Sequence, residues 1–420
     1  MTQLKEKTMK FCDRTIEFCL FGFIFFLPFA KAALTTFTWL AIAAWLVKKT
    51  LSLQYESGGF EKKSTVTTLD KAIFAFVIAN ALSVLASVDF GFSLKAFFAK
   101  LTKFILFYFV VSEAINTKRR LRNIIFVMFL SAILIVSDAC VQYITGKDFL
   151  RSYRMVELSA SFLSANGFAG WLLIYIFVFL GIINSKTFIL PNKKVMNLGL
   201  SLLILLLAIC LILTKSRAAF LGFWVALVLF VYWYSRFWKR WKARLFYFSI
   251  AVCLIAVFLI FPHSFSEGMK SLFSLKRGSS SLERITLWRQ SLTIVEDFPL
   301  FGSGLNTYTN VIKKYLAFEG GGMYPHNSFL HMAAELGMIG LTAFILLLVS
   351  LFQLVFRELK KKHDALILSV SCGILGFLVL SFFDTHLYAL QSVSLFWFMI
   401  GFTVSLTRLE MNPQEEFHQS

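Results

Sequence analysis

The residue best suited to chemistry in this sequence is a histidine that directly precedes a long apolar run. The chain reads Pro325-His326-Asn327-Ser328 at this point, and a proline here fits the first turn of a helix. His326 is therefore predicted at a helix N-terminus, where the helix dipole disfavours imidazolium and lowers the pKa. A neutral imidazole near pH 7 can act as a general base. The alternative is a histidine that only caps a helix at the lipid headgroup layer.

Four cationic side chains could hold an anionic substrate group. Lys215 and Arg217 stand in a very short connection between two apolar runs, and Arg284 and Arg289 lie on a predicted amphipathic helix. A guanidinium can bind a phosphate through two parallel hydrogen bonds. We therefore predict that Arg217 and Arg284 bind an anion, with Lys215 and Arg289 as further contacts. The alternatives are an arginine that reaches lipid phosphate and, for Arg289, the solvated face of a helix.

Two glycines follow the histidine at a specific spacing. From His326 to Gly340 the chain reads HN-x9-GxxG, with Gly337 as the first glycine. Such a match is expected by chance only about 0.002 times in a chain of this composition. The segment resembles the signature of the O-antigen ligase and O-antigen polymerase superfamily, in which a periplasmic histidine begins a span that carries paired glycines. The glycines themselves are predicted to serve close helix packing.

Two further segments carry the same resemblance. The pair Ser216-Arg217 is similar to the family's Ser-Arg pair between two spans. The stretch from Arg284 to Trp288, followed by the turn Pro-Leu-Phe-Gly-Ser-Gly, looks like the family's arginine-to-tryptophan helix and its glycine turn. The resemblance covers residues 210–342, and the first five apolar runs match only in hydropathy.

The resemblance implies a reaction and a role for each of these residues. Members of the superfamily transfer a glycan from an undecaprenyl diphosphate carrier to an acceptor hydroxyl. Arg217 and Arg284 would hold the departing diphosphate, and His326 would deprotonate the acceptor, with inversion at the anomeric carbon. The outer carboxylates are scattered rather than clustered, so we expect no metal and no cofactor. Further substrate contacts are expected from Lys215, Asn327, Arg289 and Lys103.

Length and composition place these residues in a membrane protein. The chain has 420 residues, of which 58% are hydrophobic and only 15% are charged, and its mean hydropathy is +0.73. The net charge of +19 could suggest a nucleic-acid partner, but the cations lie between apolar runs, which excludes a nucleic-acid domain as the main interpretation. The six cysteines show neither a CxxC pair nor a cluster, so no disulfide framework or zinc site is predicted.

Twelve apolar runs predict an all-α polytopic membrane protein with about 12 transmembrane helices. The first two runs are short, and they meet in a hairpin turn at Leu27-Pro28-Phe29-Ala30-Lys31. The runs are centred on residues 15–29, 32–47, 69–87, 93–114, 123–144, 161–183, 196–214, 218–235, 245–262, 328–355, 365–385 and 388–406.

Charge sets the predicted orientation. With the N-terminus inside, 26 of the 42 Lys and Arg fall on segments predicted to be cytoplasmic, as the positive-inside rule requires. Both termini are therefore predicted in the cytoplasm, with an uncleaved first span, in the bacterial inner membrane. The active site would then face the periplasm.

The predicted domains follow from the long connection before the tenth run. Nine transmembrane helices occupy residues 1–262, a periplasmic cap occupies 263–327, three more transmembrane helices occupy 328–407, and 408–420 form a cytoplasmic tail. Within the cap, apolar residues at three- and four-residue spacing predict an amphipathic helix that ends at Asp297.

Other polar residues lie in apolar surroundings. Asn327, His331 and Glu335 recur every four residues and predict one polar stripe along the tenth span. We expect Glu335 to pair with Lys100 or Lys103, although a proton outlet for His326 is the alternative. Asp384 and His386 are predicted in an outer turn, where lining the mouth of the site is favoured over a part in catalysis.

The favoured function is an O-antigen ligase that transfers glycan to lipid A core oligosaccharide in lipopolysaccharide biosynthesis. Its partners would be the undecaprenyl diphosphate-linked donor, the lipid A core acceptor and membrane lipids, without nucleic acid. An O-antigen polymerase or protein O-oligosaccharyltransferase is the alternative within the superfamily. The short loop at 146–160 favours the ligase, since a polymerase is expected to have a second long arginine-rich loop. The more distant rival is a lipid-linked glycan transporter, which would place its charges near the membrane midplane.

Overall fold

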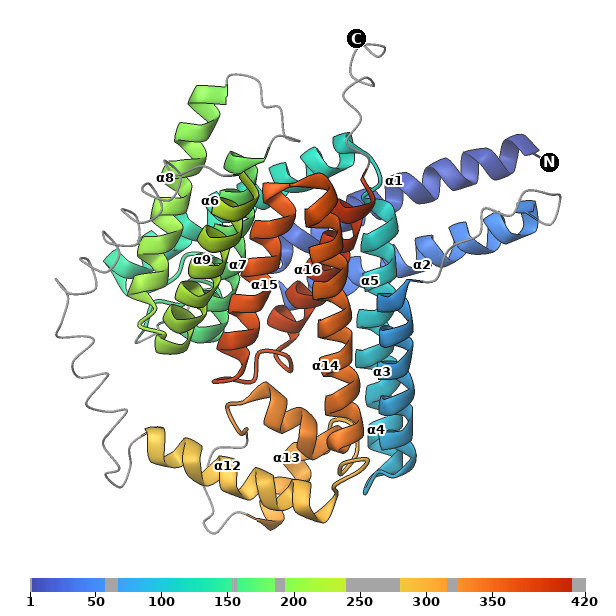
Figure 1. Ribbon diagram of the computed structural model, residues 1–420, viewed down its shortest axis with the longest axis vertical. Helices are drawn as coiled ribbons and strands as arrows, with labels where there is room; N and C mark the ends of the chain where they lie inside the picture. The colour runs from blue at the N-terminus through green and yellow to red at the C-terminus, as the bar shows by residue number, and fades with distance from the viewer. Residues whose placement is uncertain are drawn as a thin grey trace.

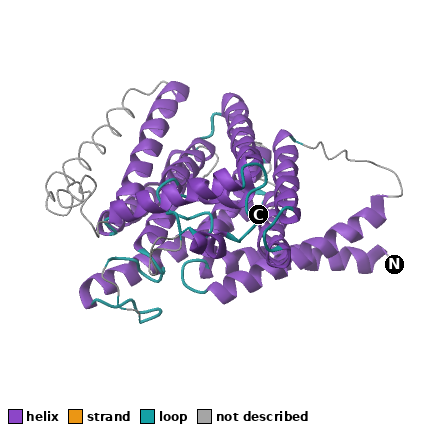
Figure 2. Cartoon of the chain, turned by 90° about the horizontal axis from the view of Figure 1, so that it is seen from below, coloured by secondary structure: helices purple, strands orange, loops and turns teal. Residues whose placement is uncertain are grey.

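The protein is an assembly of helices. A computed structural model describes residues 2–56, 67–152, 154, 157–185, 193–238, 280–315 and 324–409. Within these residues no strand occurs (Figure 2), and the predicted all-α class is confirmed. The helices are α1 (Thr2–Phe26), α2 (Lys31–Glu56), α3 (Thr68–Leu85), α4 (Phe90–Ala96), η1 (Phe97–Thr102), α5 (Lys103–Ala114), α6 (Lys118–Thr145), α7 (Ala165–Asn184), α8 (Lys193–Leu213), α9 (Arg217–Trp238), α12 (Ser280–Asp297), α13 (Tyr308–Val311), η2 (Ile312–Lys314), α14 (Ser328–Lys362), α15 (Ala365–Ser381) and α16 (Leu390–Arg408).

Each predicted apolar run within the described residues overlaps a helix, although the run at 93–114 is divided into α4, η1 and α5. The run at 245–262 lies outside the described residues. Within the described part, seven helices are long and apolar enough to cross a membrane, namely α3, α6, α7, α8, α9, α14 and α16. The protein is therefore a multi-pass membrane protein. The shorter α15 is also apolar. Helix α1 falls short of a full span because charged residues recur through its first half.

The predicted turn between the first two runs is confirmed, since α1 ends at Phe26 and α2 begins at Lys31. Figure 1 shows the two helices side by side, tilted strongly across the other helices. The tip of this hairpin packs on the start of α16, where Gln391 Nε2 donates to the carbonyls of Leu27 (3.0 Å) and Pro28 (2.6 Å). The hairpin is therefore fixed to the bundle through its turn.

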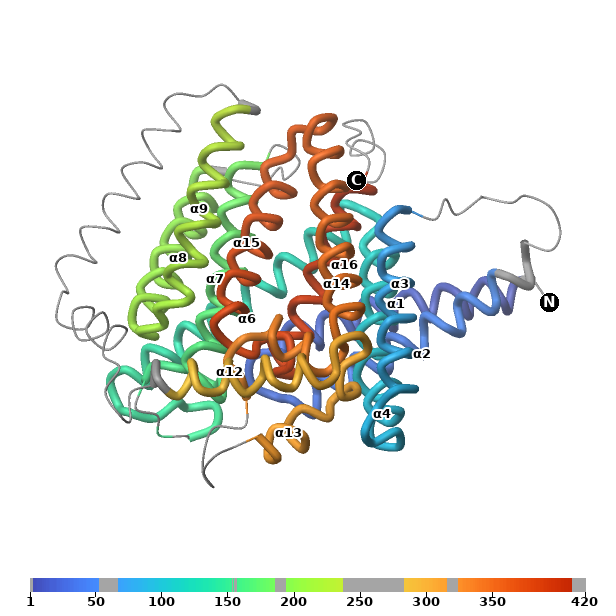
Figure 3. The backbone as a smooth tube through the Cα atoms, turned by 60° about the horizontal axis from the view of Figure 1, so that its bottom comes forward, coloured from blue at the N-terminus to red at the C-terminus, as the bar shows by residue number. Residues whose placement is uncertain are grey.

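The interior of the bundle consists of α7, α15 and α16. Almost every residue of these three helices is buried. Helix α15 packs between α7 and α9, and α16 packs along α5 (Figure 3). The turn between α15 and α16 lies at one end of the bundle.

That end is covered by a cap. We use this name for residues 280–315, which include α12, α13 and η2. Figure 1 shows α12 lying across the bundle end, beneath α14. The predicted helix and its end at Asp297 are confirmed. The predicted apolar face is wrong in part, because Ile285 and Leu292 are exposed while Leu287, Ser291 and Ile294 are buried. The cap therefore packs onto the bundle through the apolar face of α12.

The cap is also hydrogen-bonded into α14, which is broken at Gly337 (φ 66°, ψ −174°). The loop after α12 enters this break. Ser303 N and Gly304 N donate to the free carbonyls of α14, at 2.9 Å each, and Met338 N and Ile339 N donate back to the loop carbonyls at 2.9 and 3.2 Å. The two helical bonds lost at the break are thus replaced by four bonds to the loop, as a membrane interior requires.

Only glycines fit where the loop crosses α14. A Cβ on Gly302 would lie 2.3 Å from the Glu335 carbonyl, and one on Gly337 would lie 2.2 Å from Leu300 O. The prediction that the paired glycines serve close packing between regular helices is therefore wrong for Gly337. This glycine breaks the helix, and its left-handed φ is the conformation that favours glycine.

Candidate active site

His326 lies at the cap end of the bundle, directly before α14. The N-cap is Asn327, whose Oδ1 accepts hydrogen bonds from Phe329 N and Leu330 N at 3.0 Å each. His326 itself has a left-handed φ of 46°. The predicted position of the histidine at a helix N-terminus is confirmed. The side-chain oxygen of Asn327 is therefore occupied by the backbone amides of the first turn of α14.

Asp384 is the partner of His326. His326 Nδ1 lies 3.1 Å from Asp384 Oδ1, in the turn between α15 and α16. The other carboxylate oxygen accepts from Asn166 Nδ2 at 2.7 Å, at the start of α7, and Thr385 N donates to Oδ1 at 2.8 Å. In the same turn, Ser328 Oγ donates to the Asp384 carbonyl at 2.8 Å. The carboxylate is thus held by three separate segments of the chain.

The environment keeps Asp384 ionised. Burial opposes ionisation of Asp384, but the hydrogen bond from His326 and the nearby His386 hold the pKa of its carboxyl well below the usual range. A carboxylate can only accept a hydrogen bond, so a neutral His326 carries its proton on Nδ1. Its Nε2 is then free to accept a proton from a substrate. The His326 side chain is 40% exposed, against 15% for Asp384, so a substrate can reach it.

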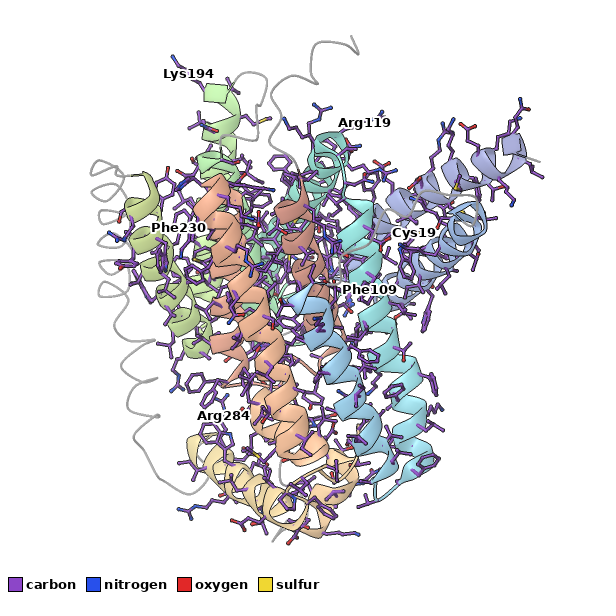
Figure 4. All side chains as sticks on the ribbon, turned by 45° about the vertical axis from the view of Figure 1, so that its right-hand side comes forward. Cys19, Phe109, Arg119, Lys194, Phe230 and Arg284 are labelled. Carbon is purple, nitrogen blue, oxygen red and sulfur yellow. The ribbon has the colours of Figure 1, made fainter. Side chains whose placement is uncertain are left out.

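The indole of Trp288 holds the His326 segment to the cap. Trp288 Nε1 donates to Pro325 O at 2.6 Å, and the indole packs edge-on against Phe382 at 6.3 Å. Arg284 lies one helical turn before Trp288, so both side chains share one face of α12. Figure 4 shows Arg284 on the side of α12 that faces the bundle. By contrast, Arg289 is exposed.

Arg217 begins α9 after the tight turn predicted between two spans. Helix α8 ends at Leu213, and Ser216 Oγ accepts from Ala219 N at 3.4 Å in the first turn of α9. Arg217 is half-buried, and the charge of Arg284 is close enough to act on it. Lys215 has a left-handed φ of 55° and is exposed. The two predicted arginines therefore lie within electrostatic range of each other.

Helix packing brings the elements that carry the arginines and the histidine to one end of the bundle. Helix α9 packs along α15, which leads directly into the Asp384 turn, and α12 packs on α14. Arg217, Arg284 and His326 are therefore all carried by elements at the cap end, and each of the three is partly buried. This arrangement could hold an anionic group on the arginines and place a proton acceptor beside it.

Lys103 lies apart from this group, on α5. The expected pairing of Glu335 with Lys100 or Lys103 is wrong. Glu335 Oε1 instead lies 3.2 Å from His331 Nε2 and accepts from Tyr308 N at 3.1 Å. The polar stripe of Asn327, His331 and Glu335 is buried along its whole length. Lys100 Nζ donates to Asn306 of the cap at 2.5 Å.

The hydrogen bonds of Asp384 to His326 and Asn166 were not predicted from the sequence. For Asp384 the sequence analysis favoured a position lining the mouth of the site over a part in catalysis. Asn166 was not considered, and Trp288 was noted only for the family resemblance. The hydrogen bond from Trp288 to Pro325 spans 37 residues, and the contact between His326 and Asp384 spans 58. The spacing of residues within one segment does not indicate contacts between segments so far apart in the sequence.

The chain was compared with protein-family models and with curated proteins. Residues 202–345 match a family model described as O-antigen ligase. The match runs from α8 into α14 and includes Arg217, Arg284 and His326, so the resemblance predicted from the sequence is confirmed over this part of the chain. No curated protein matches the chain.

Proposed function

We propose that this protein is a glycosyltransferase that moves O-antigen glycan from undecaprenyl diphosphate to lipid A core oligosaccharide, because residues 202–345 match a family model described as O-antigen ligase. The contact between His326 and Asp384 is the observation that carries the proposal, and Arg217 and Arg284 lie on helices at the same end of the bundle. It combines a proton acceptor with two groups suited to a departing diphosphate. The bacterial inner membrane, with the cap on the periplasmic face, is the proposed location.

His326 Nε2 takes the proton of the acceptor hydroxyl. The acceptor oxygen forms a bond to the anomeric carbon, and the bond from that carbon to the diphosphate oxygen breaks. The diphosphate leaves with the bonding electrons, and Arg217 and Arg284 stabilise the charge that develops on it. Asp384 fixes the imidazole tautomer and stabilises the imidazolium that forms, without taking up the proton itself. Attack opposite the leaving group inverts the anomeric centre.

The arginine pair takes the place that a divalent cation occupies in other diphosphate-leaving reactions, so the proposed reaction needs no metal and no cofactor. Transfer by the purified protein is expected to continue in excess EDTA. Activity that is lost in EDTA and restored by Mg²⁺ would contradict this part of the proposal.

The ligase is favoured over a polymerase of the same superfamily because the connection at 146–160 is short, whereas a polymerase is expected to have a second long arginine-rich loop. A deletion strain distinguishes the two. Loss of a ligase leaves full-length glycan on the lipid carrier and none on lipid A core, whereas loss of a polymerase leaves core capped with a single repeat unit. Normal lipopolysaccharide in the deletion strain would refute both.

A further inference from the structure

A buried histidine and glutamate lie at the junction between the cap and the bundle. His331 and Glu335 are each only 2% exposed, and His331 Nε2 lies 3.2 Å from Glu335 Oε1. Within the described residues, no protein group bonds to His331 Nδ1 or Glu335 Oε2. A buried polar pair of this kind is costly compared with apolar side chains of similar volume. Packing alone therefore does not account for the two residues, and their contacts indicate what they hold in place.

The imidazole of His331 contacts rings from two separate parts of the chain. It stacks on Tyr388, with the ring centroids 3.6 Å apart and an angle of 3° between the planes, and its centroid lies 4.4 Å from that of Tyr308. Tyr308 belongs to the cap, whereas Tyr388 belongs to the turn between α15 and α16 that carries Asp384. Figure 1 shows the cap directly below the end of α15, where this turn begins. One side chain thus links the cap to the turn that carries the partner of His326.

Glu335 fixes His331 on the cap side. The carboxylate oxygen that contacts His331 also accepts from Tyr308 N at 3.1 Å. The backbone carbonyl of Glu335 accepts from Gly304 N of the cap at 2.9 Å. The hydroxyl of Tyr308 lies 2.7 Å from Ser291 Oγ of α12. The orientation of the imidazole therefore depends on the docked cap.

On the other side, Tyr388 is bonded into the same short turn as Asp384. Tyr388 N donates to Thr385 O at 3.1 Å, and Thr385 N donates to Asp384 Oδ1 at 2.8 Å. This is the carboxylate oxygen that lies 3.1 Å from His326 Nδ1. A displacement of the Tyr388 ring would therefore move the oxygen that holds the histidine.

We infer that His331 is a positioning residue that couples the docked cap to the Asp384 carboxylate. Glu335 and the cap orient the imidazole, and its stack with Tyr388 fixes the turn. The turn in turn aligns Asp384 with its histidine partner. His331 touches no reacting group in this scheme and acts only through the turn. Its effect on transfer rests on the proposed function, whereas the coupling of the cap to the turn does not.

The coupling is tested without any transfer reaction, by hydrogen exchange of the purified full-length protein. Tyr308→Ala removes the cap ring that contacts His331. The amides of Leu387 and Tyr388 should then exchange about threefold faster or more, because the turn opens locally more often. In a His331→Ala background, Tyr308→Ala should add no further acceleration. Unchanged exchange of the two amides in Tyr308→Ala would overturn the coupling, and so would the same acceleration with and without His331.

General destabilisation is controlled with a second buried residue of the same helix. Leu347→Ala also opens a cavity on α14, but sixteen residues after His331 and away from the turn. Exchange of Leu387 and Tyr388 in this variant should stay within about twofold of wild type. An acceleration equal to that in Tyr308→Ala would show that lost stability, and not the contact with His331, loosens the turn.

The effect on the reaction is tested by a double-mutant cycle with Asp384→Asn. His331→Ala should lower kcat about tenfold and leave the KM for the donor within about twofold, since a misplaced carboxylate impairs the chemical step and not binding. In the Asp384→Asn protein the same substitution should change kcat less than about twofold, because the contact through which His331 acts is already lost. A tenfold loss in both backgrounds is what a merely structural role predicts, and it would overturn the positioning role.

Variants of Tyr388 provide a second route if His331→Ala does not fold. Tyr388→Ala should reproduce the loss of kcat. Tyr388→Phe, which keeps a ring for the stack, should recover most of that loss. Equal kcat values for the two Tyr388 variants would contradict a role for the stack.

The two kinds of measurement separate this inference from the proposed function. If Tyr308→Ala loosens the turn through His331 but the unsubstituted protein transfers no glycan, the proposed function is refuted and the coupling stands. If the protein transfers glycan and the losses from His331→Ala and Asp384→Asn are independent, the proposed function stands and the positioning role of His331 is refuted.

Discussion

Nδ1 of His326 lies 3.1 Å from Oδ1 of Asp384, so that the last residue before α14 is held by the turn between α15 and α16. The carboxylate is buried and makes two further hydrogen bonds, to Asn166 Nδ2 and Thr385 N. This geometry assigns the proton of a neutral His326 to Nδ1 and leaves Nε2 for substrate.

Asp384→Asn should lower kcat about a hundredfold, the scale of lost general-base catalysis, with little change in the KM for the donor. The asparagine amide can donate to Nδ1, which places the imidazole proton on Nε2 and blocks proton transfer. Initial rates over a range of donor concentrations give both constants. Asn166→Ala, which removes only one support of the carboxylate, should reduce kcat less. Wild-type kcat in Asp384→Asn would contradict the role of the pair.

The stability of the protein should depend on pH through Asp384. Its pKa in the folded protein is held well below that of an unfolded aspartate, about 3.9. The ionised carboxylate therefore stabilises the folded state above about pH 4, and this stabilisation is lost as the pH falls through the folded pKa. The difference in unfolding temperature between wild type and Asp384→Asn should be constant above about pH 5 and shrink below pH 4. If the difference in unfolding temperature grew as the pH fell, the pKa of Asp384 would not be lowered in the folded protein.

Arg284→Ala should reduce kcat/KM at least a hundredfold, because a bidentate contact to the leaving diphosphate is lost in the transition state. Arg284→Lys should recover only part of this loss, since an ammonium cannot form the paired bonds. Lys314→Ala provides the control in the same cap, because Lys314 is exposed and is not a predicted substrate contact, and its kcat/KM should stay within about twofold of wild type. Equal losses for the two alanine variants would remove Arg284 from the site.

Gly337→Ala should destabilise the protein by at least about 1–2 kcal/mol, the cost of a left-handed residue with a Cβ. The added methyl group would also meet Leu300 O, and the loop of the cap would have to move. Gly199→Ala in α8 is the control, because a Cβ there meets nothing within 4 Å. That substitution should be neutral or slightly stabilising in a helix. Thermal unfolding of the two variants in the same detergent makes the comparison, and an equally stable Gly337→Ala would show that the loop does not depend on this glycine.

Much of the local structure was predictable because the signals are local. The hairpin at Pro28, the tight turn at Lys215, the end of α12 at Asp297 and the histidine before α14 all follow from residue types within a few positions. Apolar runs of membrane length also specify helices without reference to the rest of the chain.

The contacts between distant segments were not predictable in the same way. Asp384 reaches His326 across α14 and α15, and the charge pattern gave Glu335 a lysine partner where the structure gives it His331. Gly337 shows the same limit. A GxxG pair in an apolar helix indicates close packing, and its left-handed φ arises only because the loop at Gly302 enters the helix.

The break in α14 also determines how the cap can come away from the bundle. The amides of Met338 and Ile339 donate only to Pro299 O and Leu300 O, and lipid offers them no replacement acceptor. Detachment of the cap would therefore leave the amides beside Gly337 of α14 without acceptors, so it cannot occur by gradual fraying from the edge of the cap. In hydrogen-exchange measurements these two amides should exchange together with those of Ser303 and Gly304, as one cooperative unit. Under conditions in which every opening leads to exchange, their common exchange rate is the rate at which the cap opens.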